Sequence, residues 1–182
     1  MQNLVPQLIL EKYAAGEHSG QMDVVSLFVD ISGFSTVTST LAQHGSEAAE
    51  VMADVMSRVF APLVDAVYAQ DGFITTFAGD GFTALFPGSS PAPRALAAAL
   101  AIQSQMTTYP VQETPFGHFP FAVKLGLGEG RVDWGILLPE GDQVKAAYFF
   151  GGPAVDTAAA AEAHAQPGNI ILHAAVAAAL EG

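Results

Sequence analysis

The stretch Val24–Ser35, with the sequence VVSLFVDISGFS, sets an aspartate between a run of apolar residues and a glycine. Val24 to Val29 is apolar almost throughout, which is typical of a buried strand. Gly33 opens the segment 33–43, whose pattern predicts a helix. Asp30 is therefore expected at the carboxyl end of a strand, just before the start of a helix.

A second aspartate, Asp80, stands in the segment FAGDGF, residues 77–82. The residues 72–77 and 82–86 are predicted to be strands that a hairpin turn through this aspartate joins. If the hairpin lies beside the first strand, both carboxylates converge on one point at the edge of a sheet.

The rest of the chain alternates between helical and extended patterns. Helices are expected over 4–13, 46–70, 95–107, 156–165 and 174–180, and strands over 121–127, 132–138, 146–150 and 169–172. This order predicts an α+β fold, a ferredoxin-like sandwich with a mostly antiparallel sheet and helices on one face. We expect one domain, 1–182, with a lead-in helix in residues 1–20. The abrupt end of the chain after its last predicted helix favours a domain taken from a longer multidomain protein.

Charge and composition exclude several classes of protein. Six Lys and Arg stand against eighteen Asp and Glu, and the net charge of −12 would repel nucleic acid. The chain has no cysteine, and its five histidines lack the paired spacing of a zinc site. Neither a secretory signal nor a membrane span is indicated, so we expect a cytoplasmic domain that binds no membrane. The apolar fraction of 51% with so few charges favours a surface that a partner covers.

Two aspartates at one edge of a sheet are suited to binding divalent metal ions. Carboxylates that bridge two Mg²⁺ or Mn²⁺ ions support in-line displacement at phosphorus, and the carbonyl of Ile31 would add an oxygen ligand that hard cations prefer. The N–H groups at the start of the following helix favour anions. We expect them to bind phosphate at four residues: Ser32, Gly33, Phe34 and Ser35. Alternatively, Asp30 caps this helix and Asp80 belongs to an ordinary hairpin turn, which would make both roles structural.

Together these segments resemble the class III adenylyl and guanylyl cyclases. The residues FVDISGFS, 28–35, are similar to the first metal motif of that family, and FAGD, 77–80, to its second. The similarity continues through VKLGLGEG, 123–130, and FGGPAVD, 150–156, and extends over nearly the whole chain. Within the family, the chain looks most like the first cyclase domain of soluble adenylyl cyclase and its bacterial relatives.

The resemblance implies a reaction, a substrate and a metal site. Class III cyclases place their active site at a dimer interface, and each site draws on both subunits. The family pattern implies that Asp30 and Asp80 are metal ligands, that Ile31 contributes its carbonyl, and that two Mg²⁺ or Mn²⁺ ions bind. It favours ATP as the substrate, converted to cyclic AMP and pyrophosphate in intracellular signalling.

Four positions depart from the family pattern, all in the half of the site that complements the metals. Thr76 stands where the family has its purine-selecting Lys, and Phe149 where it has a second base-selecting residue, Asp or Thr. Asp156 replaces the Asn that orients the ribose, and Ala160 replaces the Arg that stabilises the transition state. No catalytic residue of this half is therefore expected in the chain itself.

The cations of the chain support the same interpretation. None of the six cations lies in either aspartate motif. They are Lys12, Arg58, Arg94, Lys124, Arg131 and Lys145. Arg58 and Arg94 are expected to be solvated on helices, and Lys145 is the one candidate near the site. Phosphoryl transfer needs positive charge beyond the metals, and an Arg in that role is worth about a thousandfold in rate or more. We therefore expect the metal-donating half of a heterodimeric site, completed by a complementary cyclase domain in the same polypeptide, whereas a homodimer in isolation would be inactive.

Two other functions fit parts of the sequence. A degenerate cyclase homology domain would regulate or dimerise without catalysis, although nothing structural requires it to retain both aspartates. The segment AGDGF, 78–82, is also similar to the signature of diguanylate cyclases, which share the sheet plan, but the acidic residue after Gly-Asp is absent here. The choice between ATP and GTP stays open, because the residues that decide it are replaced.

Overall fold

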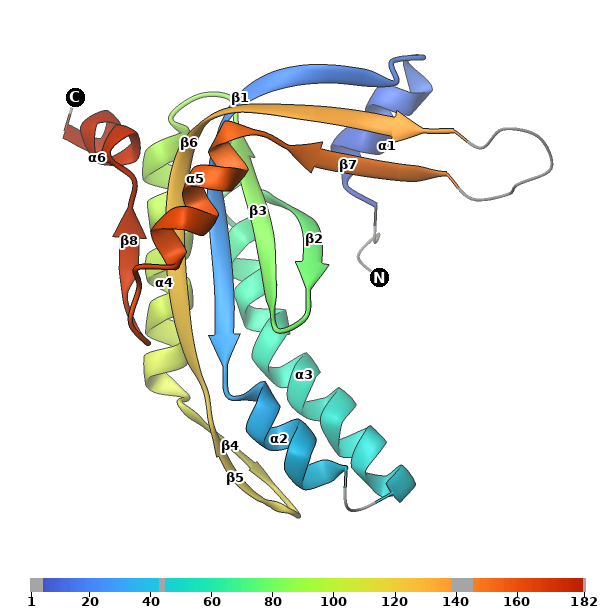
Figure 1. The fold of residues 1–182 in the computed structure, drawn as a ribbon, viewed down its shortest axis with the longest axis vertical. Helices are drawn as coiled ribbons and strands as arrows, with labels where there is room; N and C mark the ends of the chain where they lie inside the picture. Colours follow the sequence, from blue (N-terminus) through green and yellow to red (C-terminus); the bar gives the residue numbers. More distant parts are fainter. Residues whose placement is uncertain (1–4, 43–44, 139–145, 182) are drawn as a thin grey trace.

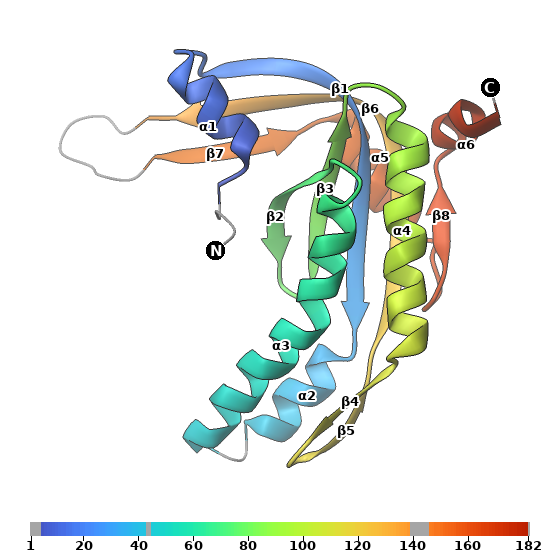
Figure 2. The same ribbon diagram turned by 180° about the vertical axis from the view of Figure 1, so that it is seen from behind.

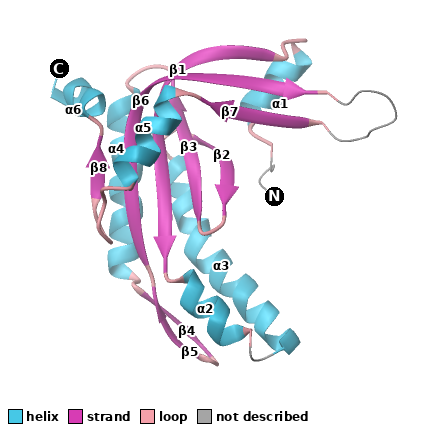
Figure 3. Ribbon diagram, in the orientation of Figure 1, coloured by secondary structure: helices cyan, strands magenta, loops and turns pink. Residues whose placement is uncertain are grey.

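One sheet forms the centre of the molecule (Figure 1, Figure 3). The structure, a computed structural model, describes residues 5–42, 45–138 and 146–181. Within them the strands follow the order β2-β3-β1-β6-β7, and β8 pairs in parallel with β6, whereas all other pairs of this sheet are antiparallel. The strands are β1 (Ser19–Ser32), β2 (Phe73–Ala78), β3 (Gly81–Pro87), β6 (Ala122–Leu137), β7 (Ala147–Gly151) and β8 (Ile170–Leu172).

Helices cover both faces of this sheet. Figure 2 shows α3 (Gly45–Tyr68) and α4 (Pro91–Thr108) in front of it, and Figure 1 shows α5 (Pro153–Glu162) on the opposite face. Alternate residues of β1, among them Leu27 and Val29, are fully buried in the core cluster that contains residues of α3 and α4. The predicted α+β class is confirmed, and α5 adds a helix to the face on which none was expected.

Smaller elements surround this centre. α1 (Gln7–Ala14) lies beside the ends of β1, β6 and β7, which bend away from the rest of the sheet (Figure 1). α2 (Phe34–Leu41) follows β1, α6 (Ala174–Glu181) follows β8, and β4 (Val111–Thr114) pairs with β5 (Gly117–Pro120) in a separate hairpin. Of the helices in the described ranges, none is both long and apolar enough to cross a bilayer.

The structure corrects several predicted boundaries. The two strands expected over 121–127 and 132–138 are one continuous strand, β6, because Gly130, at a φ of 151°, continues the strand without a turn. β1 begins at Ser19 rather than Val24, since its first residues pair with the far part of β6. α4 begins at Pro91 rather than at residue 95, and the short hairpin of β4 and β5 was not predicted.

Arg94 is not the solvated helix residue that the sequence predicted. Its guanidinium donates hydrogen bonds to the carbonyls of Gln70 at 3.0 Å, Asp71 and Ser89 at 3.2 Å each, and Pro87. It therefore ties the loop before β2 to the loop after β3. Arg58 agrees better with the prediction, because it lies at the surface of α3.

Two glycines of β6 allow α5 to approach the sheet closely. A methyl group at Gly126 would overlap the carbonyl of Ala158 and the amide of Glu162, and one at Gly128 would overlap the amide of Ala158. Only hydrogen fits at these positions, so backbone contact with β6 fixes the height of α5 above the sheet. The place of Glu162, at the end of α5, is fixed in the same way.

We expect Gly126→Ala to lower the free energy of unfolding by roughly 2–3 kcal/mol, because the added methyl group forces α5 away from β6. Gly151→Ala is the matched control, since a Cβ there would meet nothing within 4 Å. Urea denaturation followed by circular dichroism measures both. Equal midpoints for the two variants would contradict the close contact of α5 with β6.

Candidate functional site

The carboxyl end of β1 and the turn between β2 and β3 meet at one edge of the sheet (Figure 1). Asp30 pairs in register with Gly81, the first residue of β3. The N–H of Ile31 donates a hydrogen bond to the carbonyl of Asp80 at 3.0 Å. The predicted neighbourhood of the two aspartates is therefore confirmed, and both residues are half-buried at an accessible edge. Their role as metal ligands stays a prediction.

Gly81 makes this approach possible. A side chain at Gly81 would overlap the carbonyl of Val29, so only glycine lets β3 lie so close to β1 at this point. Gly79 precedes the aspartate with a φ of 62°, in the left-handed region that favours glycine. The Gly-Asp-Gly sequence thus serves both the turn and the contact with β1.

Lys124 is the residue at this edge that sequence reasoning missed. It pairs in register with Asp30 across β1 and β6, and its Nζ lies 2.8 Å from Oδ2 of Asp30 and 2.5 Å from Oε1 of Glu162. The hydrogen bonds to Asp30 and then to Glu162 raise the pKa of the Lys124 ammonium well above its ordinary value. Lys124 is therefore positively charged throughout the physiological pH range.

A weak signal for Lys124 was present in the sequence. Along 122–128 the buried residues Val123, Leu125 and Leu127 alternate with small residues, and Lys124 is the one charged residue among them. This alternation indicates a strand with one apolar face and places Lys124 on the other. The partner of Lys124 could not be found in this way, because the register of β6 against β1 is a tertiary feature.

The start of α2 lies directly after the sheet edge that carries Asp30 and Asp80, which we call the metal edge after its predicted role. Gly33 is the N-cap residue at a φ of 122°, and a Cβ there would lie 2.5 Å from the carbonyl oxygen of Pro120. Ser32 donates a side-chain hydrogen bond to the carbonyl of Ala122 at 3.2 Å. Phe34 is buried, with its ring centroid 4.8 Å from that of Phe121, so its side chain belongs to the core. Phosphate binding by residues 32–35 therefore stays a prediction about the main-chain N–H groups of the first turn.

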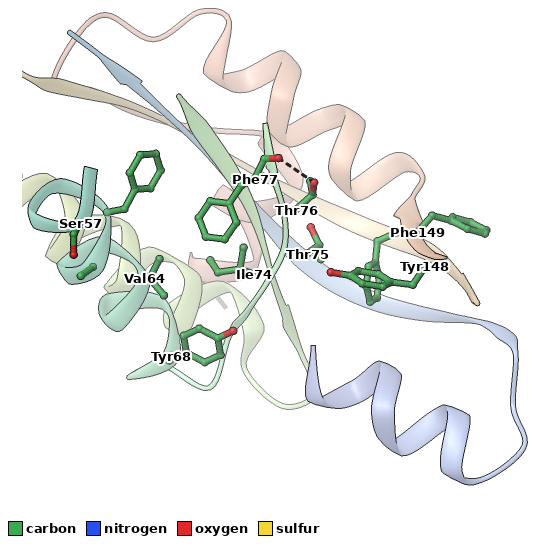
Figure 4. Close-up of a pocket in the computed structure, with 12 residues that line it drawn as sticks. Ser57, Val64, Tyr68, Ile74, Thr75, Thr76, Phe77, Tyr148 and Phe149 are labelled. Carbon is green, nitrogen blue, oxygen red and sulfur yellow. Dashed lines mark hydrogen bonds between the residues drawn. The ribbon is translucent and has the colours of Figure 1, made fainter. Parts of the chain in front are cut away.

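The two positions that the resemblance assigns to base selection lie on one cavity, away from Asp30 and Asp80. Thr76 of β2 and Phe149 of β7 line a cavity of about 640 Å³. Residues of α3 line the same cavity (Figure 4). Its wall is largely aromatic: Phe60, Tyr68, Phe77, Tyr148, Phe149 and Phe150. Thr76 turns its hydroxyl to the carbonyl of Phe77 at 3.3 Å (Figure 4). The cavity thus has Thr76 in place of the Lys, and Phe149 in place of the Asp or Thr, that the resemblance implies for reading a purine.

The other two replaced positions, Asp156 and Ala160, are exposed on α5 and do not line this cavity. They lie one helical turn apart, as the spacing of four residues requires. Lys145, the cation that the sequence placed near the site, lies outside the described residues. Lys124 is instead the cation that the structure places beside Asp30.

The types of ligand atom at the metal edge are those that a hard divalent cation takes. They are the carboxylates of Asp30 and Asp80 with main-chain carbonyls beside them, which are oxygen ligands of the kind that Mg²⁺ and Mn²⁺ take. No group of three or more His, Cys, Asp or Glu side chains suited to a metal ion occurs in residues 5–42, 45–138 and 146–181. Two carboxylates would therefore need further oxygen atoms, such as those of a phosphate, to complete the coordination of an ion.

Comparison with known proteins agrees with this arrangement. The family model of the adenylate and guanylate cyclase catalytic domain matches residues 17–182 of this sequence. The chain is similar to adenylate cyclase type 10 of Homo sapiens, with 27% identity over 174 residues, and to that of Rattus norvegicus, with 28% over 157 residues. These matches cover 92% and 82% of this chain but only 11% and 9% of the relatives, so the chain spans about a tenth of their length.

Solved structures show the same fold. A bacterial light-regulated adenylyl cyclase aligns with a TM-score of 0.72 and 23% identity, over 97% of this chain and 51% of that one. The guanylate cyclase domain of RhGC from Catenaria anguillulae, in complex with GTP, aligns with a TM-score of 0.71 and 20% identity, over 90% and 85% of the two chains. The adenylyl cyclase CyaB from P. aeruginosa aligns with a TM-score of 0.68 and 18% identity, over 90% and 82%. On the match of the family model over residues 17–182, the chain belongs to the adenylate and guanylate cyclase catalytic domain family.

Proposed function

We propose that this chain is the metal-donating half of a cyclase site at a dimer interface, which converts ATP to cyclic AMP and pyrophosphate. The observation that carries the proposal is the meeting of Asp30 and Asp80 at one accessible edge of the sheet, where Asp30 pairs with Gly81 and Ile31 bonds to Asp80. Both aspartates belong to family motifs, and the contact of Gly81 with β1 leaves no room for a side chain.

In this proposal, Asp30, Asp80 and the carbonyl of Ile31 would hold two Mg²⁺ or Mn²⁺ ions. Such ions would favour the reactive form of the ribose 3′-hydroxyl and offset the charge of the leaving pyrophosphate. The N–H groups at the start of α2 hold phosphate oxygens beside them. The 3′-hydroxyl would lose its proton to water and its oxygen would bond to the α-phosphorus, while the bond from that phosphorus to the pyrophosphate oxygen breaks and pyrophosphate leaves with that electron pair.

A second domain is needed for the rest of the site. The cavity that contains Thr76 and Phe149 presents aromatic surface where the family reads the base, and α5 carries Asp156 and Ala160 where the family orients the ribose and stabilises the transition state. Lys124 adds a positive charge at the metal edge, but its two carboxylate partners already balance that charge. A complementary cyclase domain would supply the Lys, the Asp or Thr, the Asn and the Arg.

The choice of ATP rests on the relatives rather than on the site. The curated relatives are adenylate cyclases, whereas the solved structures of this fold include both adenylyl and guanylyl cyclases. The base-selecting positions of this chain carry no group that tells adenine from guanine. The partner domain would therefore decide between the two bases.

The metal role of the aspartates predicts a specific loss. We expect Asp30→Asn and Asp80→Asn each to weaken binding of Mn²⁺ with ATP to the purified chain by about tenfold or more, because loss even of an outer partner of a metal ligand costs 10–100-fold. Asp65→Asn, on the exposed side of α3, is the control and should bind as the unsubstituted chain does. Isothermal titration calorimetry measures all four proteins. Equal binding by all of them would contradict the assignment of the metal edge.

The missing half predicts complementation. The purified chain alone should form no cyclic AMP, since a homodimer has metal edges but no transition-state Arg. Addition of a cyclase domain that carries the four complementary residues and lacks its own metal aspartates should produce activity, measured by chromatography of the nucleotide products. Strong activity of the chain alone would show that no partner is required.

A degenerate regulatory or dimerisation domain is the second candidate. The observation in its favour is the exposed aromatic surface at the cavity, where Phe77 and Phe149 are each about half exposed. Such a surface fits contact with another domain whether or not catalysis follows. The absence of metal-dependent nucleotide binding in the calorimetry above would favour this function over catalysis.

A further inference from the structure

Glu162, the last residue of α5, is a buried carboxylate whose partner is the ammonium of Lys124. Its side chain is only 11% exposed, and its Oε1 lies 2.5 Å from Nζ of Lys124. The same ammonium lies 2.8 Å from Oδ2 of Asp30, which is 28% exposed. One positive charge is therefore shared between a helix carboxylate and a carboxylate of the metal edge.

The chain fixes both carboxylates of this triad by main-chain contacts. Asp30 is held in register between Gly81 and Lys124 on neighbouring strands. The main chain of Glu162 packs directly against Gly126 of β6, because a Cβ at Gly126 would overlap the main-chain nitrogen of Glu162. Lys124 has three donors and a flexible stem, so it is the member of the triad that adjusts.

Lys124 has two opposing effects on a divalent cation at Asp30. Its hydrogen bond orients the carboxylate, which favours metal binding, and its charge repels the cation, which opposes it. The charge effect is the larger one, because a dication doubles the Coulomb repulsion while ordering one side chain is a small contribution. A negative charge held against Lys124 therefore favours metal binding at Asp30.

We propose that Glu162 is a positioning residue for the metal edge: it holds Lys124 and offsets its charge, so that Asp30 remains available to a divalent cation. This inference rests on the proposed metal role of Asp30. Glu162 belongs to α5, the helix that carries Asp156 and Ala160. The ion pairs of Lys124 with Glu162 and Asp30 therefore link this helix to the metal edge. Neither the aspartate motifs nor the replaced positions contain Glu162.

The test is the affinity of the chain for Mn²⁺ alone, measured by the electron paramagnetic resonance signal of free Mn²⁺. Glu162→Gln keeps the shape and an oxygen acceptor for Lys124 but removes the charge. We expect it to weaken Mn²⁺ binding by about fivefold, the effect of one charge in a partly exposed site. Glu50→Gln, at an exposed position of α3, is the matched control and should leave the affinity unchanged.

The double variant Lys124→Met with Glu162→Gln decides whether Glu162 acts through Lys124. It removes one charge of each sign, so we expect its Mn²⁺ affinity to return to within about twofold of the unsubstituted chain. Lys124→Met alone should bind Mn²⁺ more tightly than the unsubstituted chain. A double variant as weak as Glu162→Gln would overturn the proposal, because simple damage to packing is not rescued by removing Lys124.

Salt provides a second measurement that needs no double variant. The loss of affinity in Glu162→Gln should shrink as NaCl rises from about 20 mM to about 500 mM. The ion would bind at Asp30, which is 28% exposed beside Lys124 at 27%, and salt screens charges at such a partly exposed edge. A loss that does not change with salt, or an affinity equal to that of the unsubstituted chain, would overturn the role of Glu162 alone. Binding of Mn²⁺ with ATP in the calorimetry above, without binding of Mn²⁺ alone, would overturn this inference and leave the proposed function standing. Failure of the unsubstituted chain to bind Mn²⁺ even with ATP would overturn both.

Discussion

The pairing of β1 with a strand on each side is the constraint on which the rest of the site depends. Both pairings include Asp30, which lies opposite Gly81 on β3 and opposite Lys124 on β6. The first pairing brings the turn with Asp80 to the end of β1, and the second brings a positive charge to the same carboxylate. A slip of one residue in either register would turn the side chains of the moved strand to the other face of the sheet.

Close contacts between main chains hold these pairings in place. Gly81 lies against Val29, Gly126 against Glu162, and Gly33 against Pro120, and at each position an added Cβ would be too close to a main-chain atom. Such contacts leave little freedom for the polypeptide at the metal edge. Only 13% of the residues are charged, so few charged side chains lie near this edge. The close contacts hold the main chain that carries them at defined positions.

The positions that the proposed function assigns to the two halves of a cyclase site lie in different parts of this one domain. The metal edge is formed by the end of β1 and the β2–β3 turn, whereas the cavity with Thr76 and Phe149 lies between α3, β2 and β7. A nucleotide held at the metal edge would meet the base-reading half of another domain. Under the proposed function, the aromatic wall of the cavity would serve contact with that domain rather than purine recognition.

Much of this arrangement was predictable from local pattern. The apolar run before Asp30 and the glycines around Asp80 were sufficient to place both aspartates at the ends of strands, because strands and turns depend on nearby residues. The α+β class followed from the order of the elements. Errors arose where distant segments decide the outcome: β6 was divided at Gly130 although its pairing with β1 keeps it continuous, and Arg94 was assigned to solvent although it bonds to two loops.

The sequence by itself determined which residues could bind metal and which family positions had been replaced, since these depend only on residue type and spacing. Only the tertiary structure decided what surrounds them. It placed Lys124 against Asp30 and Glu162, and it put α5 on the face opposite α3 and α4. The physical reason is that a cross-strand partner follows from register and a helix position follows from close contact. Both depend on residues about 40 to 90 positions apart in the chain, which no local pattern relates.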